Sequence, residues 1–346
     1  MSATDATPIL HAQAVTKWFP IERGLLRRTV GNVRAVDGVD LTVRAGTTMG
    51  LVGESGSGKS TFGRLVLRLL DPTDGRIYFD GHDVTDAHGR NLRDLRRGVQ
   101  LVFQDPHSAF DPSTTMLGAL REPMQTQLNV TRAEQVQRAR NLMSLVGLGP
   151  HLLDRLPHEL SGGQLQRIAV ARALAVEPKL VVLDEPVSSL DVSTQAQVVN
   201  LLRRLQDQLG IAYLFIAHDL AVVRHVSDDL SVMYLGRIVE QGPAEIVYVS
   251  PRHPYTEALL SAIPVPDPSR QRQRKRIILR GDIPSPAQPP AGCNFHTRCP
   301  YVMDICRTID PEPFKPGDGT SVACHLHTSG PELRGASVLE FHSDPA

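Results

Sequence analysis

The chain has 346 residues, enough for one large domain or two ordinary ones around a substantial core. Because 37 Lys and Arg balance 37 Asp and Glu, no overall charge draws it to nucleic acid or lipid, and no nucleic-acid partner is expected. No apolar stretch reaches the roughly 18 residues of a spanning helix, and the start, MSATDATPIL, lacks the regions of a signal peptide. A cytosolic protein is predicted, one that can still dock on a membrane protein.

The first third of the chain predicts strands around a glycine-rich loop. Alternating apolar residues over about 9–19 and 33–43 indicate two strands of an antiparallel edge. TTMGLVG (47–53) indicates a short buried strand, and a glycine loop follows it. The next segment repeats apolar residues at helical spacing, namely Phe62, Leu65, Val66 and Leu69.

The middle of the chain predicts a parallel sheet with a helical insertion. VQLVFQ (99–104) favours a strand, and 105 to about 175 predicts a helical subdomain, in which Thr131 and Glu134 form a capping box. The runs KLVVLDEP (179–186) and AYLFIAHD (212–219) are typical of parallel strands covered on both faces. Residues 194–209 have the length and periodicity of the helix that must connect such a pair. The fold class is therefore α/β.

The amino-acid composition changes after about residue 251. Prolines between 264 and 290 surround RQRQRKR (270–276), which favours a linker with a solvated charge run over a lipid-binding patch. The predicted parts are a domain over 1–250, a helix and proline-rich linker over 251–292, a four-cysteine domain over 293–330 and a tail over 331–346.

The loop GESGSGKS (53–60) matches G-x-x-x-x-G-K-[ST] between a predicted strand and a predicted helix. Glycines let backbone N–H groups wrap a β-phosphate, Lys59 reaches the β- and γ-phosphates, and Ser60 offers a hydroxyl to Mg²⁺. The loop predicts binding of a nucleoside triphosphate with Mg²⁺, by Gly53, Ser55, Gly56, Ser57, Gly58, Lys59, Ser60 and Thr61.

Polar residues end the predicted strands beside this loop. Asp184 is placed to steady the metal and Glu185 to polarise an attacking water, because phosphoryl transfer depends mainly on positioning and charge stabilisation. His218 ends the next strand and is a candidate partner of the γ-phosphate, although a lone histidine is more often structural. Gln104 is a candidate for Mg²⁺ or water.

A second anion-binding pattern, LSGGQ (160–164), precedes another predicted helix, whose first N–H groups favour negative charge. In order and spacing, these motifs and SSLD (188–191) make residues 9–250 resemble the ATP-binding-cassette (ABC) ATPases. The resemblance implies a RecA-like parallel core, an antiparallel β edge and an inserted helical subdomain. It also implies two cassettes placed head to tail, so that the LSGGQ of one closes over ATP held by the other.

The resemblance assigns roles by position. Lys59 and Glu185 act on the phosphates and the water, Gln104 and Asp184 serve the metal, and His218 senses the γ-phosphate. Phe19 is the residue expected to stack on adenine, with Trp18 as the alternative. The residues expected at the interface between cassettes are Ser161, Gly162, Gly163, Gln164 and, in the loop after the LDE strand, Asp191.

The last third resembles the tail of ATP-binding subunits from bacterial oligopeptide and dipeptide importers, a group that also contains nickel importers. The resemblance rests on SPRHPYTEALLSAIP (250–264) and GCNFHTRCPYVMDICRTIDPE (292–312). Some of these proteins are thought to hold a [4Fe-4S] cluster here, and zinc or free thiols are the alternatives. The candidate ligands are Cys293, Cys299, Cys306 and Cys324, with His296, His325 and His327 nearby.

The resemblance implies an ATP-hydrolysing subunit on the cytoplasmic face of the membrane. Its implied partners are a homologous ATPase in a heterodimer or homodimer, two permease subunits and an extracytoplasmic binding protein, and peptide is the expected cargo. A nickel or other small-solute importer is the alternative. A soluble ABC ATPase is less favoured, because the chain has neither a long coiled coil before LSGGQ nor a second cassette.

Overall fold

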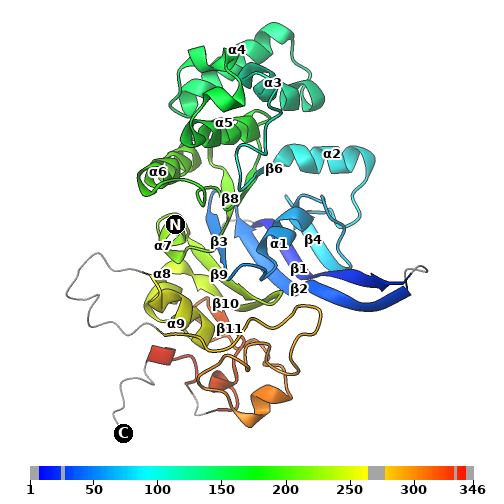
Figure 1. Cartoon of the computed structure of the whole chain (residues 1–346), viewed down its shortest axis with the longest axis vertical. Coiled ribbons are helices and arrows are strands. Elements are labelled where there is room, and N and C mark those ends of the chain that lie inside the picture. Colours follow the sequence, from blue (N-terminus) through cyan, green and yellow to red (C-terminus); the bar gives the residue numbers. More distant parts are fainter. Residues whose placement is uncertain (1–7, 25–27, 264–276, 331–332, 340–346) are drawn as a thin grey trace, which may run out of the picture.

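The computed structural model describes residues 8–24, 28–263, 277–330 and 333–339. The charge run 270–276 lies outside these residues. Two sheets organise the described chain, with a group of helices at one end and the last third of the chain at the other (Figure 1). None of the described helices combines the length and apolar character needed to cross a membrane.

The larger sheet has seven strands in the order β11-β10-β9-β3-β8-β7-β6. The five strands from β9 to β6 run parallel, whereas β10 and β11 add an antiparallel edge. Strands β3, β7 and β8 are buried along their whole length, which explains their continuous apolar sequences. The bounds are β3 Thr48–Val52, β6 Val99–Val102, β7 Leu180–Asp184, β8 Ala212–Ala217, β9 Asp229–Tyr234, β10 Arg237–Pro243 and β11 Ser321–Val322.

The smaller sheet is antiparallel, in the order β2-β1-β4-β5. Its strands are β1 Pro8–Arg23, β2 Arg28–Arg44, β4 Asp74–Phe79 and β5 His82–Asp83. A continuous apolar core joins this sheet to α1 (Lys59–Val66) and to one face of the larger sheet. Leu69 was expected on the apolar face of this helix, but α1 ends first, because Arg68 takes a left-handed conformation with φ +52°. Leu69 is therefore 47% exposed.

The helical end of the molecule contains α3 (Met116–Gln127), α4 (Arg132–Leu145) and α5 (Gly162–Leu174) (Figure 1). The predicted capping box begins α4, since the Glu134 carboxylate accepts from the Thr131 N–H at 2.7 Å and the Thr131 hydroxyl accepts from the Glu134 N–H. The remaining helices are α2 Gly89–Gly98, α6 Val192–Leu209, α7 Leu220–Arg224, α8 Ala244–Val249 and α9 Pro254–Ser261.

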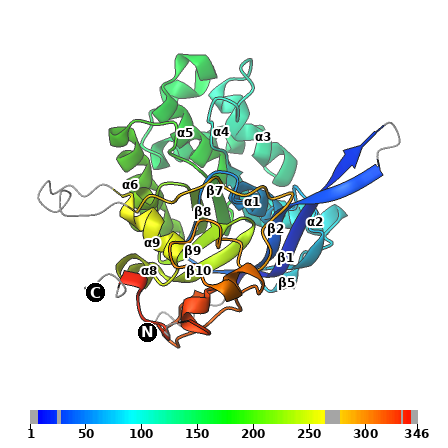
Figure 2. The same ribbon diagram turned by 60° about the horizontal axis from the view of Figure 1, so that its bottom comes forward.

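Helices α8 and α9 and the residues from 277 onward lie at the end of the molecule away from α3, α4 and α5 (Figure 2). Strand β11 pairs with β10, and Arg252 binds Asp318 through both terminal nitrogens, at 2.6 and 3.1 Å. The linker also contacts β2, where the Arg34 N–H donates to the Pro286 carbonyl at 2.9 Å. The last third is thus attached to both sheets through backbone and side-chain bonds.

Candidate functional site

The glycine loop connects β3 to α1 along a path that only glycine permits at both ends. Gly53 has φ +157° and Gly58 has φ +107°. A Cβ at Gly53 would lie 2.1 Å from the Met233 carbonyl oxygen, and one at Gly58 would lie 2.1 Å from that of Ala35. The loop therefore packs its backbone against neighbouring backbone, which is the close approach that an N–H cradle requires.

Lys59 begins α1 and is 4% exposed. Its ammonium donates to the carbonyls of Gly53 and Glu54, both at 2.8 Å, and to the Ser57 hydroxyl at 3.2 Å. Burial lowers the pKa of Lys59, and the nearby carboxylates of Glu185, Asp184 and Glu54 oppose that shift. One buried positive charge thus lies within the curve of the loop.

Ser60 and Asp184 meet at the end of β7. The Ser60 hydroxyl donates to Asp184 Oδ1 at 2.8 Å. Burial raises the pKa of Asp184, and the bond from Ser60 partly offsets this shift. A hydroxyl and a carboxylate beside a phosphate cradle form the oxygen donor set that Mg²⁺ prefers, so these residues fit the expected metal.

Glu185 leaves the strand direction directly after β7. It has φ +48°, a conformation that is uncommon for a non-glycine residue and concentrates at functional sites. Its carboxylate oxygen Oε2 accepts from Gln104 Nε2 at 2.9 Å and lies 3.1 Å from His218 Nδ1. Side chains from the ends of β6, β7 and β8 therefore converge on one carboxylate.

A cavity of about 60 Å³ lies beside this convergence, lined by Glu185, His218 and Gln195 among others. The space is large enough for water, since a cavity needs roughly 10–15 Å³ to hold one molecule. The arrangement provides room for a water next to a carboxylate, which is the geometry of a general base.

LSGGQ begins α5. Ser161 caps the helix, with its hydroxyl accepting from the Gln164 N–H at 3.3 Å while the Gln164 side chain accepts from the Ser161 N–H at 3.0 Å. Ser161 is exposed and the next three residues are half-buried. In Figure 1 α5 belongs to the helical end, well away from α1. The two anion-binding patterns are therefore separate sites within one chain.

Asp191 caps α6 rather than projecting freely. Its carboxylate accepts from the Thr194 N–H at 2.9 Å and from the Ser193 and Thr194 hydroxyls. These bonds, led by the one from Ser193, hold the pKa of Asp191 well below its ordinary value. The residue fixes the turn after SSLD at the start of the helix.

The two candidate adenine-stacking residues lie side by side on β1. The Trp18 indole donates to Asp37 Oδ1 at 3.1 Å, and the Arg34 guanidinium lies 4.9 Å from the Trp18 ring centroid. The Lys17 ammonium lies over the Phe19 ring, 5.2 Å from its centroid. Both rings are half-buried. These contacts do not select between the two, and Phe19 stays a prediction.

The four cysteines are free thiols. Burial raises the pKa of Cys293 to about 11 and that of Cys299 to about 12, and it also raises the pKa of Cys324. The neighbouring cysteines add to these shifts, and a bound metal would itself deprotonate the thiols that coordinate it. In the described part of the chain, no group of three or more His, Cys, Asp or Glu is placed to hold a metal ion. The expected [4Fe-4S] cluster or zinc therefore stays a prediction.

Sequence reasoning missed a set of contacts between the phosphate loop and the last third of the chain. The Glu54 carboxylate binds Arg298 through two bonds, at 2.6 and 3.0 Å. The Glu54 N–H donates to the Tyr255 hydroxyl at 2.8 Å. The sequence contained one signal for these contacts, which is the acidic residue Glu54 inside the anion-binding loop. A negative charge at that place requires a counter-charge.

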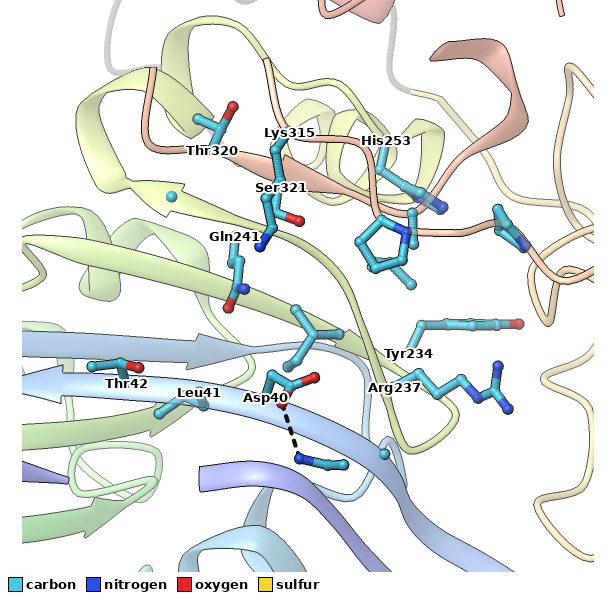
Figure 3. Close-up of a pocket in the computed structure, with 18 of the residues that line it drawn as sticks. Asp40, Leu41, Thr42, Tyr234, Arg237, Gln241, His253, Lys315, Thr320 and Ser321 are labelled. Carbon is cyan, nitrogen blue, oxygen red and sulfur yellow. Dashed lines mark hydrogen bonds between the residues drawn. The ribbon is translucent and has the colours of Figure 1, made fainter. Parts of the chain in front are cut away.

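A larger cavity, about 1420 Å³, lies elsewhere, between β2, β10 and the C-terminal segment (Figure 3). Its lining contains no residue of the loop 53–60. Two of its cations are paired, Arg237 with Asp37 at 2.8 Å and Arg44 with Asp229 at 2.5 Å. Volume alone supplies no chemistry, whereas the smaller cavity adjoins the Glu185 carboxylate and its partner His218.

Comparison with known proteins gives a consistent result. The family described as "ABC transporter" matches residues 36–188, and the one described as "Oligopeptide/dipeptide transporter, C-terminal region" matches residues 239–306. The oligopeptide transport ATP-binding protein AppF of Bacillus subtilis (strain 168) is 48% identical, over 95% of this chain and 100% of that protein. The probable peptide ABC transporter ATP-binding protein y4tS of Sinorhizobium fredii is also 48% identical, over 92% of this chain and 90% of its own length.

Solved structures of ATP-binding cassettes match about two thirds of the chain. A dimeric ATP-binding cassette in a post-hydrolysis state, bound to ADP and Pi, aligns with a TM-score of 0.61 and 27% identity. The alignment covers 68% of this chain and 98% of that cassette.

Proposed function

Because the chain belongs to the ABC transporter ATP-binding proteins of the oligopeptide/dipeptide group, we propose that it hydrolyses ATP to drive the import of peptides through membrane permease subunits. This membership confirms the resemblance drawn from residues 9–250, 250–264 and 292–312, together with the α/β cassette fold. The observation that carries the proposed chemistry is the convergence of Gln104 and His218 on the Glu185 carboxylate, beside the Ser60–Asp184 pair.

The phosphate loop is proposed to bind ATP through its backbone N–H groups and Lys59. The Lys59 ammonium exchanges its bonds to the Gly53 and Glu54 carbonyls for phosphate oxygens. Ser60, Asp184 and Gln104 are proposed to hold Mg²⁺, which supplies charge neutralisation at the phosphates. Burial of the lysine makes that exchange favourable, because an anionic phosphate stabilises a buried cation better than neutral carbonyls do.

Glu185 is proposed to take the proton from an attacking water. Gln104 and His218 orient its carboxylate, so the base is already aligned when the γ-phosphate is in place. His218 is also proposed to contact the γ-phosphate. It could then distinguish ATP from ADP and report that difference to Glu185.

A second cassette is proposed to complete the site. The exposed N-terminus of α5 at Ser161 offers N–H donors and the positive end of a helix dipole, but within its own chain it lies apart from α1. In a head-to-tail pair, Ser161, Gly162, Gly163 and Gln164 of one subunit close over ATP held by the other. The partner is a second copy or a homologue. The pair acts at the cytoplasmic face on two permease subunits, to which an extracytoplasmic binding protein delivers the cargo.

Reconstitution tests the cargo. The chain is co-expressed with its permease and binding-protein partners, and radiolabelled tri- to pentapeptides and ⁶³Ni²⁺ are offered to the vesicles. ATP-dependent peptide uptake that is lost in Glu185→Gln supports peptide import. Uptake of nickel with no uptake of peptide would replace peptide as the cargo.

Metal analysis tests the four cysteines. A [4Fe-4S] cluster predicts brown protein that loses its colour in Cys299→Ser. Zinc predicts colourless protein with stoichiometric zinc, and free thiols predict neither metal.

A further inference from the structure

Glu54 is an acidic residue inside a loop that binds anions, and each of its polar groups has a different partner. Its carbonyl accepts from Lys59 Nζ at 2.8 Å, and its N–H donates to the Tyr255 hydroxyl at 2.8 Å. Its carboxylate binds both terminal nitrogens of Arg298. One loop residue thus connects the phosphate-binding lysine to two residues of the last third of the chain.

Both side-chain partners of Glu54 belong to a packed aromatic cluster, Tyr255 as one of its rings and Arg298 against it. The Arg298 side chain is only 7% exposed, and its guanidinium lies 6.0 Å from the centroid of the Tyr234 ring. The rings of Tyr234, Tyr255 and Phe295 pack on one another with centroids 4.8 to 5.4 Å apart. Packing of this kind fixes the guanidinium, and the two-bond contact adds orientation as well as charge.

Electrostatics explains why this contact matters for nucleotide binding. A carboxylate beside bound phosphates repels them, and Glu54 lies close enough to Lys59 to affect its pKa. The Arg298 guanidinium carries the opposite charge and is permanently protonated. Paired with Arg298, Glu54 contributes little net charge to the cradle.

We propose that Arg298 is a positioning residue for ATP binding, which holds the Glu54 carboxylate against the C-terminal region and cancels its charge at the phosphate loop. The inference rests on the proposed ATP-binding function. It gives the last third of the chain a role at the phosphate loop, through one ion pair that spans 244 positions of sequence.

The test is ATP affinity, measured with a fluorescent ATP analogue on the full-length chain, together with steady-state ATPase kinetics. Arg298→Met leaves the Glu54 charge unpaired, and the Kd and KM for ATP are expected to rise about tenfold or more, with little change in kcat. Added salt should reduce this loss, because it screens the repulsion. Glu54→Gln in the Arg298→Met background removes the repelling charge and should restore the affinity to within about threefold of the parent.

Asp318→Asn is the matched control. It breaks another two-bond arginine–carboxylate contact of the same C-terminal segment, the one with Arg252, whose side chain bonds Asp318 and Thr320. The control should bind ATP as the parent does. Equal losses in Asp318→Asn and Arg298→Met would reduce Arg298 to an ordinary structural contact.

A second pair of variants covers the case in which Arg298→Met does not fold. Glu54→Asp keeps the charge on a side chain too short for both bonds and should weaken ATP binding, whereas Glu54→Gln alone should not. Parental affinity in Arg298→Met, failure of Glu54→Gln to rescue it, or tight binding by Glu54→Asp would each overturn the inference. A parent chain that binds no ATP would instead reject the proposed function.

Discussion

Replacing Glu185 with Gln tests the proposed base with the smallest change of shape. Glutamine has the same length, and its carbonyl oxygen can still accept from Gln104 Nε2, which lies 2.9 Å from Glu185 Oε2. The left-handed backbone at this position is kept in place by the bond from the Glu185 N–H to the Ile216 carbonyl, which the substitution does not touch. The variant therefore loses the ability to accept a proton while the local geometry stays.

The size of the effect follows from that loss. General-base catalysis contributes roughly 10² to 10⁴ in rate, so kcat should fall by on the order of 10² or more. The contacts of Lys59, Ser60 and Asp184 are unchanged, and the Kd for ATP should stay within about threefold of the parent. Because ATP is bound but not consumed, the variant should accumulate as a closed pair of cassettes.

Phosphate release measures the rate, a fluorescent ATP analogue measures binding, and size-exclusion chromatography with ATP measures pairing. Glu177→Gln is the control, because Glu177 also has a positive φ, of 57°, but lies on the surface in an ion pair with Arg138. Parental turnover in Glu185→Gln, or equal loss in the control, would remove Glu185 from the role of base.

Three further predictions concern the loop, the interface and the sheet edge. Gly58→Ala should lower the free energy of unfolding in urea by about 1–3 kcal/mol and abolish nucleotide binding, because the added Cβ would lie 2.1 Å from the Ala35 carbonyl oxygen. Gly31→Ala is the control, since the nearest atom to its Cβ is 3.8 Å away, and it should change neither property. Ser161→Ala removes the cap of α5 and should lower the free energy of unfolding by about 1 kcal/mol and weaken ATP-dependent pairing of the cassettes. Ser161→Thr should keep the stability and the pairing of the parent. Unchanged pairing in Ser161→Ala would contradict the proposed interface. Burial raises the pKa of Glu240 to about 7 from an ordinary 4.5, so its stabilising contribution is complete below about pH 4.5 and is lost as the pH rises through 7. The Glu240 contribution to the unfolding free energy should therefore fall by up to about 3 kcal/mol between pH 5 and 8. Burial lowers the pKa of His253 to about 3, which changes the stability of the parent in the opposite direction, so the contribution of Glu240 is measured as the pH-dependent difference between the parent and Glu240→Gln in urea titrations.

The parts of the fold that could be predicted are those determined by residues close together in the sequence. The apolar runs of β7 and β8 have no polar face because both of their faces are covered, and that burial is visible in the sequence itself. The Thr131–Glu134 capping box is equally local, since both of its bonds join residues three positions apart. The same holds for the phosphate loop, whose glycines mark backbone positions that a side chain would block.

Other parts depend on residues that only folding brings together. β9, which is buried along its whole length, and β10, which is partly buried, were not predicted. The turn between them interrupts the pattern at Leu235 and Gly236, and β10 takes β11 as its other neighbour from about 80 residues later. The pairing of Glu54 with Arg298 spans the chain from the first glycine loop to the cysteine region. No periodicity encodes such a contact, and only the misplaced charge of Glu54 pointed to it.

The proposed catalytic groups share one property that bears on how ATP acts. Each is already hydrogen bonded to another protein group: Lys59 to loop carbonyls, Ser60 to Asp184, and Gln104 to Glu185. Binding of ATP and Mg²⁺ must therefore exchange bonds rather than create them, so the net free energy of binding is a small difference between large terms. Gln104 differs in one respect, because its amide also carries an oxygen: its Oε1 would bind the metal while its Nε2 keeps the bond to Glu185. Metal binding and the orientation of the base would thus depend on the same side chain.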